Sequence, residues 1–308
     1  MSRSAGHDMA TPLLTLDDLQ ALHDEICGLH QYHRDMTGLS PSGDRPSRWH
    51  GQGMEAIDSR PYQPGDDIRH MDWRATARSG RPHSRVFQDE RQRSLFLVID
   101  LRSTMYFASR GELKARRALR CAALLGLATI SRREPVAGLV ITDDAIHIHP
   151  PAKGLPGLAD LVLGGSHDRA ASLPPMRGLF HGSLDRLSGI LPVGASLIFL
   201  SDLNETLGRE QETLMPLLAL AQRHTCHVIH IRDEAEHRLP AVGRVRLTGD
   251  GGLPIEIDTH DATLRTRYEE TIREHVAALD TICLSAAIQR TPMDTTEPVL
   301  ERLRDLIG

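Results

Sequence analysis

The five residues Leu95–Ile99 constrain the fold of this chain more than any other stretch. They read Leu-Phe-Leu-Val-Ile with no polar residue between them, and the run ends on Asp100. A strand with one solvated face alternates apolar and polar residues, whereas a strand of a parallel sheet covered on both faces is apolar throughout. A second run of this kind, Ser196–Leu200, ends on Ser201 and Asp202. The two runs therefore predict central parallel strands of an α/β sheet.

Strand-like and helix-like segments alternate from Ser94 to the end of the chain. This alternation is typical of a doubly wound, mostly parallel central sheet of the Rossmann-like kind, with helices on both faces. We predict that residues 94–308 form this α/β domain. The further strands expected are Val136–Thr142, Ala145–His149, His227–Ile231, Arg244–Leu247, Pro254–Ile257 and Cys283–Ile288. The helices expected are Glu112 to about Ile130, Leu158–Leu163, Ser183–Ile190, Glu210–Arg223, Ala262 to about Leu279 and Glu297–Ile307.

The residues before this domain predict a helical and loop extension. Residues 1–12 are polar and are expected to be disordered. Apolar residues at helical spacing predict a helix from Leu13 to about His33, and Thr37–Gly53 is a loop rich in Gly, Pro and Ser. We expect residues 13–93 to pack on the α/β core as an N-terminal helix followed by the charged segment described below.

Composition excludes several classes of function. The 308 residues carry a net charge of −5, so no overall basic field supports binding to nucleic acid. The four cysteines form no CxxC pair and no apolar run reaches 18 residues, so we expect free thiols, no membrane span and a cytoplasmic location. A P-loop, a GxSxG motif and an HExxH motif are all absent from the sequence. The chain is therefore not expected to hydrolyse ATP itself.

Two carboxylates mark the ends of the two apolar strands. Ligands of open α/β sheets bind beyond the carboxyl ends of the strands, where Asp100 and Asp202 are expected to meet. Two acids with nearby hydroxyl groups can hold a hard divalent cation such as Mg²⁺. One hypothesis is therefore an enzyme, a Mg²⁺-dependent phosphate-ester hydrolase that uses these two residues.

A dense run of special residues, Arg60–Arg74, precedes the first apolar strand. It contains a Pro-Gly turn at 64–65 and charges of both signs around one tryptophan. Such a run can form a charge-assisted network that clamps the N-terminal region onto the sheet, or it can be a docking surface for a partner protein. Both interpretations stay open. The candidate partner-binding residues are Tyr62, Asp66, Asp67, Arg69, Asp72, Trp73 and Arg74.

Other charged or histidine-rich stretches carry weaker signals. Six arginines between positions 74 and 93 could attract phosphates, but acidic neighbours at 72, 89 and 90 dilute that field. His147 and His149 are two residues apart and share one face of a predicted strand. No Cys or carboxylate beside them completes a recognisable zinc spacing. Nucleic-acid binding and zinc binding are therefore not predicted.

The run Arg60–Arg74 and the following strand ending on Asp100 resemble the bacterial domain of unknown function 58 family. The resemblance implies a core like that of a von Willebrand factor A domain, whose metal-ion-dependent adhesion site has the motif Asp-x-Ser-x-Ser. On that pattern Asp100 matches the first Asp, Thr104 the second Ser and Asp202 a later Asp, with Ser183 as a candidate for the middle Thr. The chain departs from the pattern at Arg102, which stands in place of the first Ser.

Arginine has five donors and no acceptor, so Arg102 cannot ligate a metal. We expect its guanidinium to lie between Asp100 and Asp202 and to take the place of the cation, while a bound Mg²⁺ with Arg102 turned outward remains the alternative. The resemblance further implies a non-enzymatic adaptor that acts with a MoxR-type AAA+ ATPase and other von Willebrand A proteins. Its role would be in complex assembly or stress-related maturation.

Overall fold

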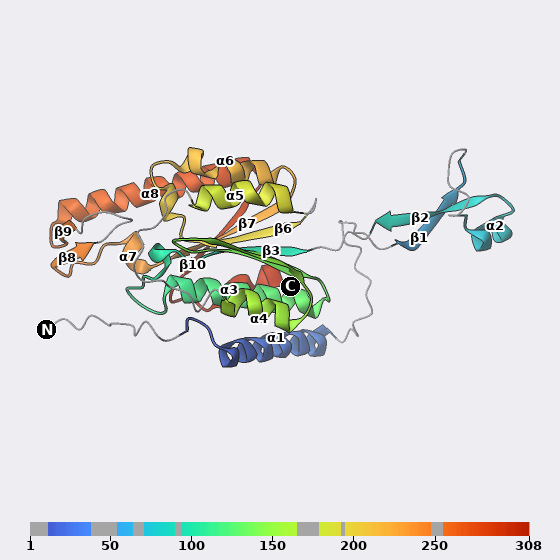
Figure 1. Ribbon diagram of the computed structural model, residues 1–308, viewed down its shortest axis with the longest axis horizontal. Coiled ribbons are helices and arrows are strands. Elements are labelled where there is room, and N and C mark those ends of the chain that lie inside the picture. The colour runs from blue at the N-terminus through green and yellow to red at the C-terminus, as the bar shows by residue number, and fades with distance from the viewer. Residues whose placement is uncertain are drawn as a thin grey trace. The chain divides into compact units, whose positions relative to one another are not determined.

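The computed structural model, shown in Figure 1, contains a mixed, mostly parallel sheet of six strands. The structure describes residues 12–37, 54–63, 71–89, 94–164, 179–191, 195–247 and 255–307. Contacts divide the chain into two compact units. One unit contains Met1–Met36 and Ser94–Gly308, and the other contains Thr37–Arg93.

The sheet of the larger unit has six strands in the order β10-β7-β6-β3-β4-β5. Neighbouring strands from β10 to β4 are parallel, and only β5 runs antiparallel, against β4. The α/β fold with a mostly parallel sheet is thus confirmed. The strands are β3 (Leu95–Asp100), β4 (Val136–Ile141), β5 (Ile146–Ala152), β6 (Ser196–Ser201), β7 (Thr225–Arg232) and β10 (Gln289–Asp294).

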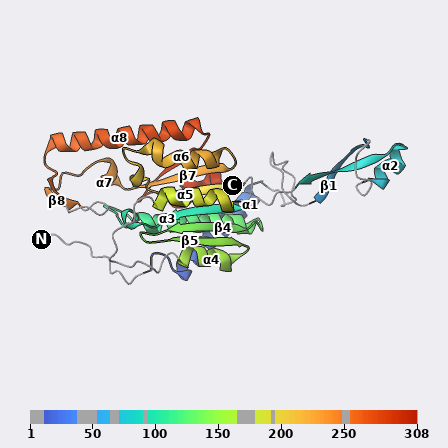
Figure 2. The same cartoon turned by 45° about the horizontal axis from the view of Figure 1, so that its top comes forward.

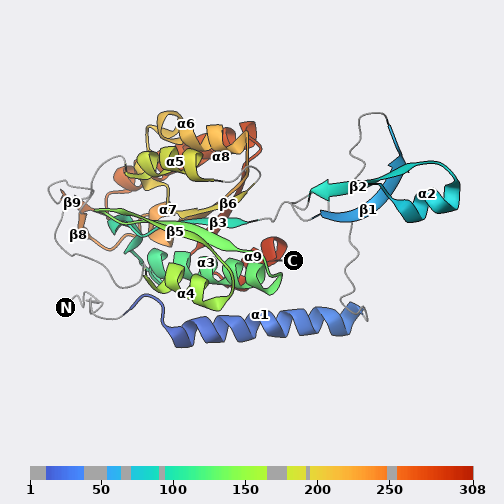
Figure 3. The same ribbon diagram turned by 45° about the vertical axis from the view of Figure 1, so that its right-hand side comes forward.

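Helices cover both faces of this sheet, which explains why its central strands are apolar throughout. Leu95, Leu97 and Ile99 of β3 pack into the core on one face, while Phe96 and Val98 pack into the core on the other. Figures 1 and 3 show α1, α3 and α4 on the first face and α5, α6 and α8 on the second. The helices are α1 (Leu16–Thr37), α3 (Lys114–Ser131), α4 (Leu155–Gly164), α5 (Leu179–Ile190), α6 (Glu210–Ala221), α8 (Ala262–Ser285) and α9 (Val299–Ile307).

Glycines let α4 approach the sheet and its neighbouring helix closely. A Cβ on Gly138 of β4 would stand 2.6 Å from Leu161 Cδ1 and 2.9 Å from the carbonyl oxygen of Leu97. A Cβ on Gly126 of α3 would stand 2.3 Å from Leu158 Cδ1. Helix α4 therefore depends on two positions without side chains.

Both edge strands of the sheet carry proline, which cannot donate to another strand. Strand β5 contains Pro150 and Pro151, and β10 contains Pro292. The prediction of a strand over Cys283–Ile288 is wrong, because α8 continues to Ser285 and the strand begins only at Gln289. A turn with Ala287 at φ 54° separates the helix from the strand.

Short elements follow the carboxyl ends of the parallel strands. They are the 3-10 helices η2 (Ser103–Met105) and η3 (Asn204–Thr206), helix α7 (Glu234–His237) and the hairpin of β8 (Arg244–Leu247) with β9 (Ile255–Asp258). Figure 2 shows α7 and β8 at one end of the larger unit, beyond the ends of the strands. These elements are the surroundings of the candidate site.

The smaller unit contains an antiparallel hairpin and a short helix. Strand β1 (Met54–Pro61) pairs with β2 (His83–Asp89), and α2 (Trp73–Ser79) lies between them in the chain. The Asp72 carboxylate accepts hydrogen bonds from the amides of Arg74 and Ala75, and Gly80 ends the helix at φ 69°. This hairpin was not predicted. The expectation that residues 13–93 pack together on the core stays a prediction, although α1 groups with the larger unit.

Candidate functional site

The loops after β3 and β6 lead to opposite faces of the sheet. Strand β3 continues into α3 on one face, while β6 continues into α6 on the other. Such a divergence between neighbouring parallel strands is the usual ligand position of an open α/β sheet. Asp100 is the last residue of β3 and Asp202 follows β6, and each side chain is only 1% exposed. The site is therefore built around two buried carboxylates.

Asp100 is held by a two-pronged ion pair with Arg102. Arg102 donates from Nε to Oδ1 at 2.9 Å and from Nη2 to Oδ2 at 2.7 Å. The hydroxyl of Ser201, the last residue of β6, donates to the same Oδ2 at 2.7 Å. Arg102 also pairs with Glu205 of η3, so it ties the loop after β3 to the loop after β6.

Asp202 has a different cation, the fully buried Lys114 at the first turn of α3. Lys114 Nζ donates to Asp202 Oδ2 at 2.8 Å and also pairs with Glu236 of α7. Asn204 donates from its amide group to Asp202 Oδ2 at 3.0 Å and to Glu236 Oε1 at 3.1 Å. The expectation that Arg102 alone compensates both carboxylates is therefore replaced by one cation for each.

The protonation states at the site follow from these pairs. Burial by itself would raise the pKa of Asp202, but Lys114 and the backbone amide of Asn204 bring that pKa below its ordinary value. Burial by itself would lower the pKa of Lys114 and of Arg102, but the facing carboxylates raise both. All three groups are consequently charged at neutral pH.

A buried histidine of the neighbouring strand β7 contacts the backbone of Asp202. His230 of β7 lies 3.0 Å, through Nε2, from the Asp202 carbonyl oxygen, and Arg290 Nη1 lies 2.9 Å from its Nδ1. Burial, and after it the positive charge of Arg290, holds the pKa of His230 well below its ordinary value. A neutral ring with its proton on Nε2 satisfies both contacts, since it donates to the carbonyl and accepts from the guanidinium.

These residues do not fit a hard divalent cation at this position. Mg²⁺ needs several oxygen ligands, yet Lys114 and Arg102 donate to the two carboxylates that would supply them. Among the residues that the structure describes, no group of three or more His, Cys, Asp or Glu is arranged to hold a metal ion. Thr104, on η2, has a buried hydroxyl that has no hydrogen-bond partner among the described residues. Ser183 is buried in α5.

Other carboxylates at the carboxyl ends of the strands also have hydrogen-bond or ion-pair partners within the chain. Asp233 follows β7 and accepts hydrogen bonds from Ser109 and Thr295, and Asp294 ends β10 beside Arg232 and His237. In the loop after β4, Asp143 accepts from the amide of Ser103 at 2.9 Å. These carboxylates connect segments that follow different strands, so polar contacts recur along the carboxyl ends of the sheet.

Sequence reasoning missed Lys114, Glu205 and Glu236. A lysine at the start of a predicted helix normally extends into solvent, and nothing in its spacing connects it to an aspartate 88 positions away. The signal that was present is chemical: two buried acids at neighbouring strand ends require two cations, and Arg102 is only one.

The run Arg60–Arg74, called the signature segment below, is described only in part. Asp66, Asp67 and Arg69 lie outside the described residues. Tyr62 is half-buried, while Arg74 is exposed and Trp73 has 64% of its surface exposed. Asp72 is a helix cap, as described above.

Comparison with known proteins establishes the family. Residues 58–278 match the family described as "Protein of unknown function DUF58". The chain belongs to this family. DUF58 relatives include the uncharacterized proteins Rv1480 of Mycobacterium tuberculosis and Mb1516 of Mycobacterium bovis, each 27% identical over 256 residues, which cover 80% of this chain and 73% of the relative.

A solved structure of an uncharacterized membrane spanning protein from Vibrio fischeri is a remote match to this DUF58 chain. It is 14% identical over 70% of this chain and 97% of that one, with a TM-score of 0.19, which is too low to indicate a shared fold. Among the described helices of the present chain, none is long and apolar enough to cross a bilayer.

Proposed function

We propose that this DUF58 chain is a non-enzymatic adaptor that binds a MoxR-type AAA+ ATPase in complex assembly or stress-related maturation. The α/β unit would be a von Willebrand factor A-like domain with a degenerate adhesion site, in the cytoplasm. The observation that supports this proposal is the internal pairing of Asp100 with Arg102 and of Asp202 with Lys114. Carboxylates with built-in counter-ions organise loops but have no free coordination position for a catalytic metal.

The surface around this network has the character of a protein-binding surface. Exposed large apolar side chains occur in the loops after β3, β6 and β7 and in the hairpin β8–β9, where no core requires them. They are Phe107, Leu207, Val242, Leu247 and Ile255, with exposed fractions from 43% to 65%. Together with the loops that carry them, we call these residues the edge surface.

The hairpin β8–β9 contributes an amphipathic element to the edge surface. Its pairs Val245–Ile257 and Leu247–Ile255 place four aliphatic side chains on one face. Its pairs Arg244–Asp258 and Arg246–Glu256 place opposite charges on the other face. An isolated two-stranded hairpin is marginally stable in water, so coverage of its apolar face by a partner would stabilise it.

The test measures binding of the purified chain to the purified MoxR-type AAA+ ATPase of the same organism, with and without ATP. We expect Leu207→Ser to weaken the affinity at least about tenfold, because it removes an apolar anchor of the edge surface. The matched control is Ile190→Ser. Ile190 is 46% exposed, against 43% for Leu207, but it precedes β6 in the chain and so lies toward the amino ends of the strands rather than their carboxyl ends. Equal effects of the two substitutions, or no binding by the wild type, would reject the proposal.

The competing function is the Mg²⁺-dependent phosphate-ester hydrolase. Its assay is hydrolysis of p-nitrophenyl phosphate with and without Mg²⁺ by wild type and Asp100→Asn. If wild type hydrolyses the substrate only with Mg²⁺ and Asp100→Asn abolishes this activity, the hydrolase function would be supported and the adaptor function rejected.

A further inference from the structure

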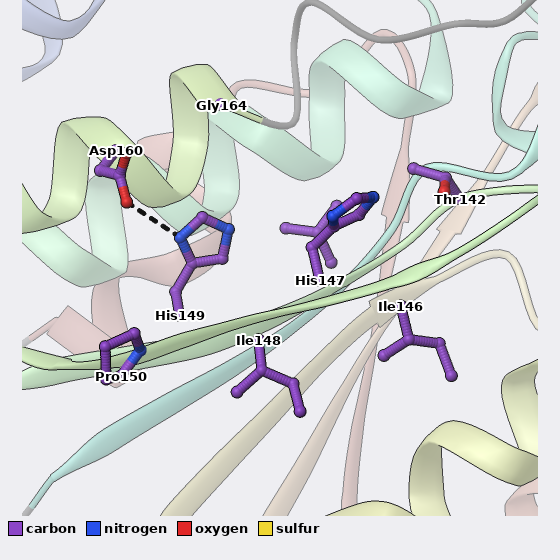
Figure 4. A pocket seen from close by; sticks show the side chains of 9 residues that line it. Thr142, Ile146, His147, Ile148, His149, Pro150, Asp160 and Gly164 are labelled. Atoms are coloured by element: carbon purple, nitrogen blue, oxygen red, sulfur yellow. Dashed lines mark hydrogen bonds and ion pairs between the residues drawn. The ribbon is translucent and has the colours of Figure 1, made fainter.

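A cavity of about 520 Å³ lies between the edge strand β5 and helix α4, and none of the residues that line it is a member of the carboxylate network described above. Figure 4 shows that His147 and His149 point from β5 to the same side of the strand, where the cavity is, while Ile146 and Ile148 point to the opposite side. Two rises of a strand, about 6.6 Å, separate side chains at i and i+2. Imidazoles at that spacing can turn their ring nitrogens toward one ion between them.

The ring of His149 is held in place by α4. Its Nδ1 lies 3.1 Å from Asp160 Oδ2, and its Cε1 lies 3.8 Å from the position of a Cβ on Gly164. The side chain of His149 is only 19% exposed, although Asp160 is 77% exposed. Because Asp160 occupies Nδ1, the nitrogen left to accept a bond from a ligand is Nε2.

This arrangement is the usual outer shell of a metal-binding histidine. A ligating histidine typically donates its other ring N–H to a carboxylate, which fixes the tautomer and raises the basicity of the ligating nitrogen. Asp160 comes from a helix that follows the strand in the chain, so the sequence spacing alone did not connect it to the two histidines. The exposed His147 supplies the second imidazole.

We propose that His147 and His149 bind one borderline transition-metal ion, of the class of Zn²⁺, Ni²⁺ or Cu²⁺, with Asp160 as a positioning residue. Imidazole nitrogens favour these ions over Mg²⁺ and Ca²⁺. Since the described part of the chain has no third side chain in position to ligate, water or an oxygen donor from a ligand completes the coordination. The open edge of the sheet leaves room for those molecules, so the ion would join β5 to α4 from the solvent side.

The experiment titrates ZnCl₂ into the chelator-treated full chain by isothermal calorimetry. We expect wild type to bind one more ion than His147→Ala or His149→Ala, with Asp160→Asn keeping that ion at roughly 10- to 100-fold weaker affinity. His260→Ala is the matched control, because it removes an exposed histidine from the turn after β9 and should leave the stoichiometry unchanged. Identical stoichiometry in wild type and both β5 variants would overturn the site.

A second readout is the Zn²⁺-induced change in thermal stability. Zn²⁺ should raise the Tm of wild type by more than that of the double variant His147→Ala with His149→Ala, since each ion bound only to the folded state stabilises it. The Tm values without metal verify that the variants fold. An equal Zn²⁺-induced rise in both proteins would contradict the proposal.

Discussion

Lys114 is the residue on which the charge balance of the site depends. It is completely buried, and it faces Asp202 and Glu236 at once. Removal of one partner from a buried ion pair leaves an uncompensated charge in a medium that solvates it poorly. We predict that Lys114→Met lowers the free energy of unfolding by about 3–5 kcal/mol, measured by urea denaturation monitored by circular dichroism.

The control for this prediction is the double variant Lys114→Met with Asp202→Asn. It removes the charge of Asp202 as well, so it should recover part of the loss and give a coupling free energy above about 0.5 kcal/mol. Additive effects of the two substitutions would show that the pair seen in the structure does not contribute to stability.

His227 on β7 should make the stability of the fold sensitive to acid. Burial lowers its pKa to about 4, against 6.5 for an exposed histidine. Between pH 6.5 and 4, His227 is protonated in the unfolded chain but neutral in the folded chain. Its contribution to stability is therefore complete above pH 6.5 and declines as the pH falls toward 4. Between pH 6.5 and 5 the loss should be about 1–2 kcal/mol.

The measurement compares unfolding free energies of wild type and His227→Gln over that range. Glutamine keeps a polar group near the Thr291 hydroxyl, which lies 2.9 Å from Nε2, but does not titrate. The variant should have a shallower decline, while the buried His230 continues to supply part of it. Parallel curves would mean that His227 is protonated equally in the folded and unfolded states.

At the scale of elements, the contact between α4 and β4 can be tested at Gly138. A methyl group there meets both the Leu161 side chain and the Leu97 backbone, and the backbone of a central strand cannot move aside. We predict that Gly138→Ala destabilises the protein by about 1–3 kcal/mol, measured by urea denaturation.

The matched substitution is Gly189→Ala in α5. No atom of the described residues lies within 4 Å of the added Cβ, so the higher helix propensity of alanine should stabilise the protein by up to about 1 kcal/mol. If both substitutions had the same sign, steric contact would not be the reason for the glycine at 138.

The sequence predicted the buried strands and the edge strand β5 well, but it misplaced the other edge strand, β10. Strands β3 and β6 are continuous apolar runs because helices cover both of their faces, so composition alone located them. Strand β10 is half-exposed and polar, with Pro292 in it, and the apolar end of α8 just before it looked more like a strand. The local sequence pattern did not show which of these two segments, the end of α8 or β10, forms the strand.

The hairpin of the smaller unit escaped prediction for a related reason. Its strands lie on either side of a charged segment that does not alternate apolar and polar residues. Residues of this segment form turns and helix caps, as Asp72 and Gly80 do at the two ends of α2. The positions of Asp100 and Asp202 at the carboxyl ends of β3 and β6 could be predicted, because strand ends are readable from the sequence. The cation that pairs with Asp202 could not, because Lys114 and Glu236 reach the site from α3 and α7 through tertiary packing alone.

At the scale of the whole molecule, the division into two units has an energetic consequence. The larger unit buries a double-sided core, whereas the smaller one has a two-stranded hairpin and a seven-residue helix with no buried residue. Hairpins of two strands are marginal on their own, and small units bury too little apolar surface to be strongly stable. The two units should therefore differ in their opening free energies.

We predict that amides of β1 and β2 exchange with deuterium much faster than those of β3 and β4, measured by mass spectrometry of peptic fragments. Sub-denaturing urea should erase the protection of β1 and β2 first, since that opening does not require the sheet to unfold. The control is α1, which groups with the larger unit although it precedes the smaller one in the chain, and which should keep protection nearer to that of α3.

Equal protection of β1, β2 and β3 would mean that a second surface stabilises the signature segment, as the clamp interpretation of Arg60–Arg74 requires. Faster exchange would instead leave that segment free to become ordered on a partner, and a rise in its protection when the AAA+ ATPase is added would identify it as part of the docking surface.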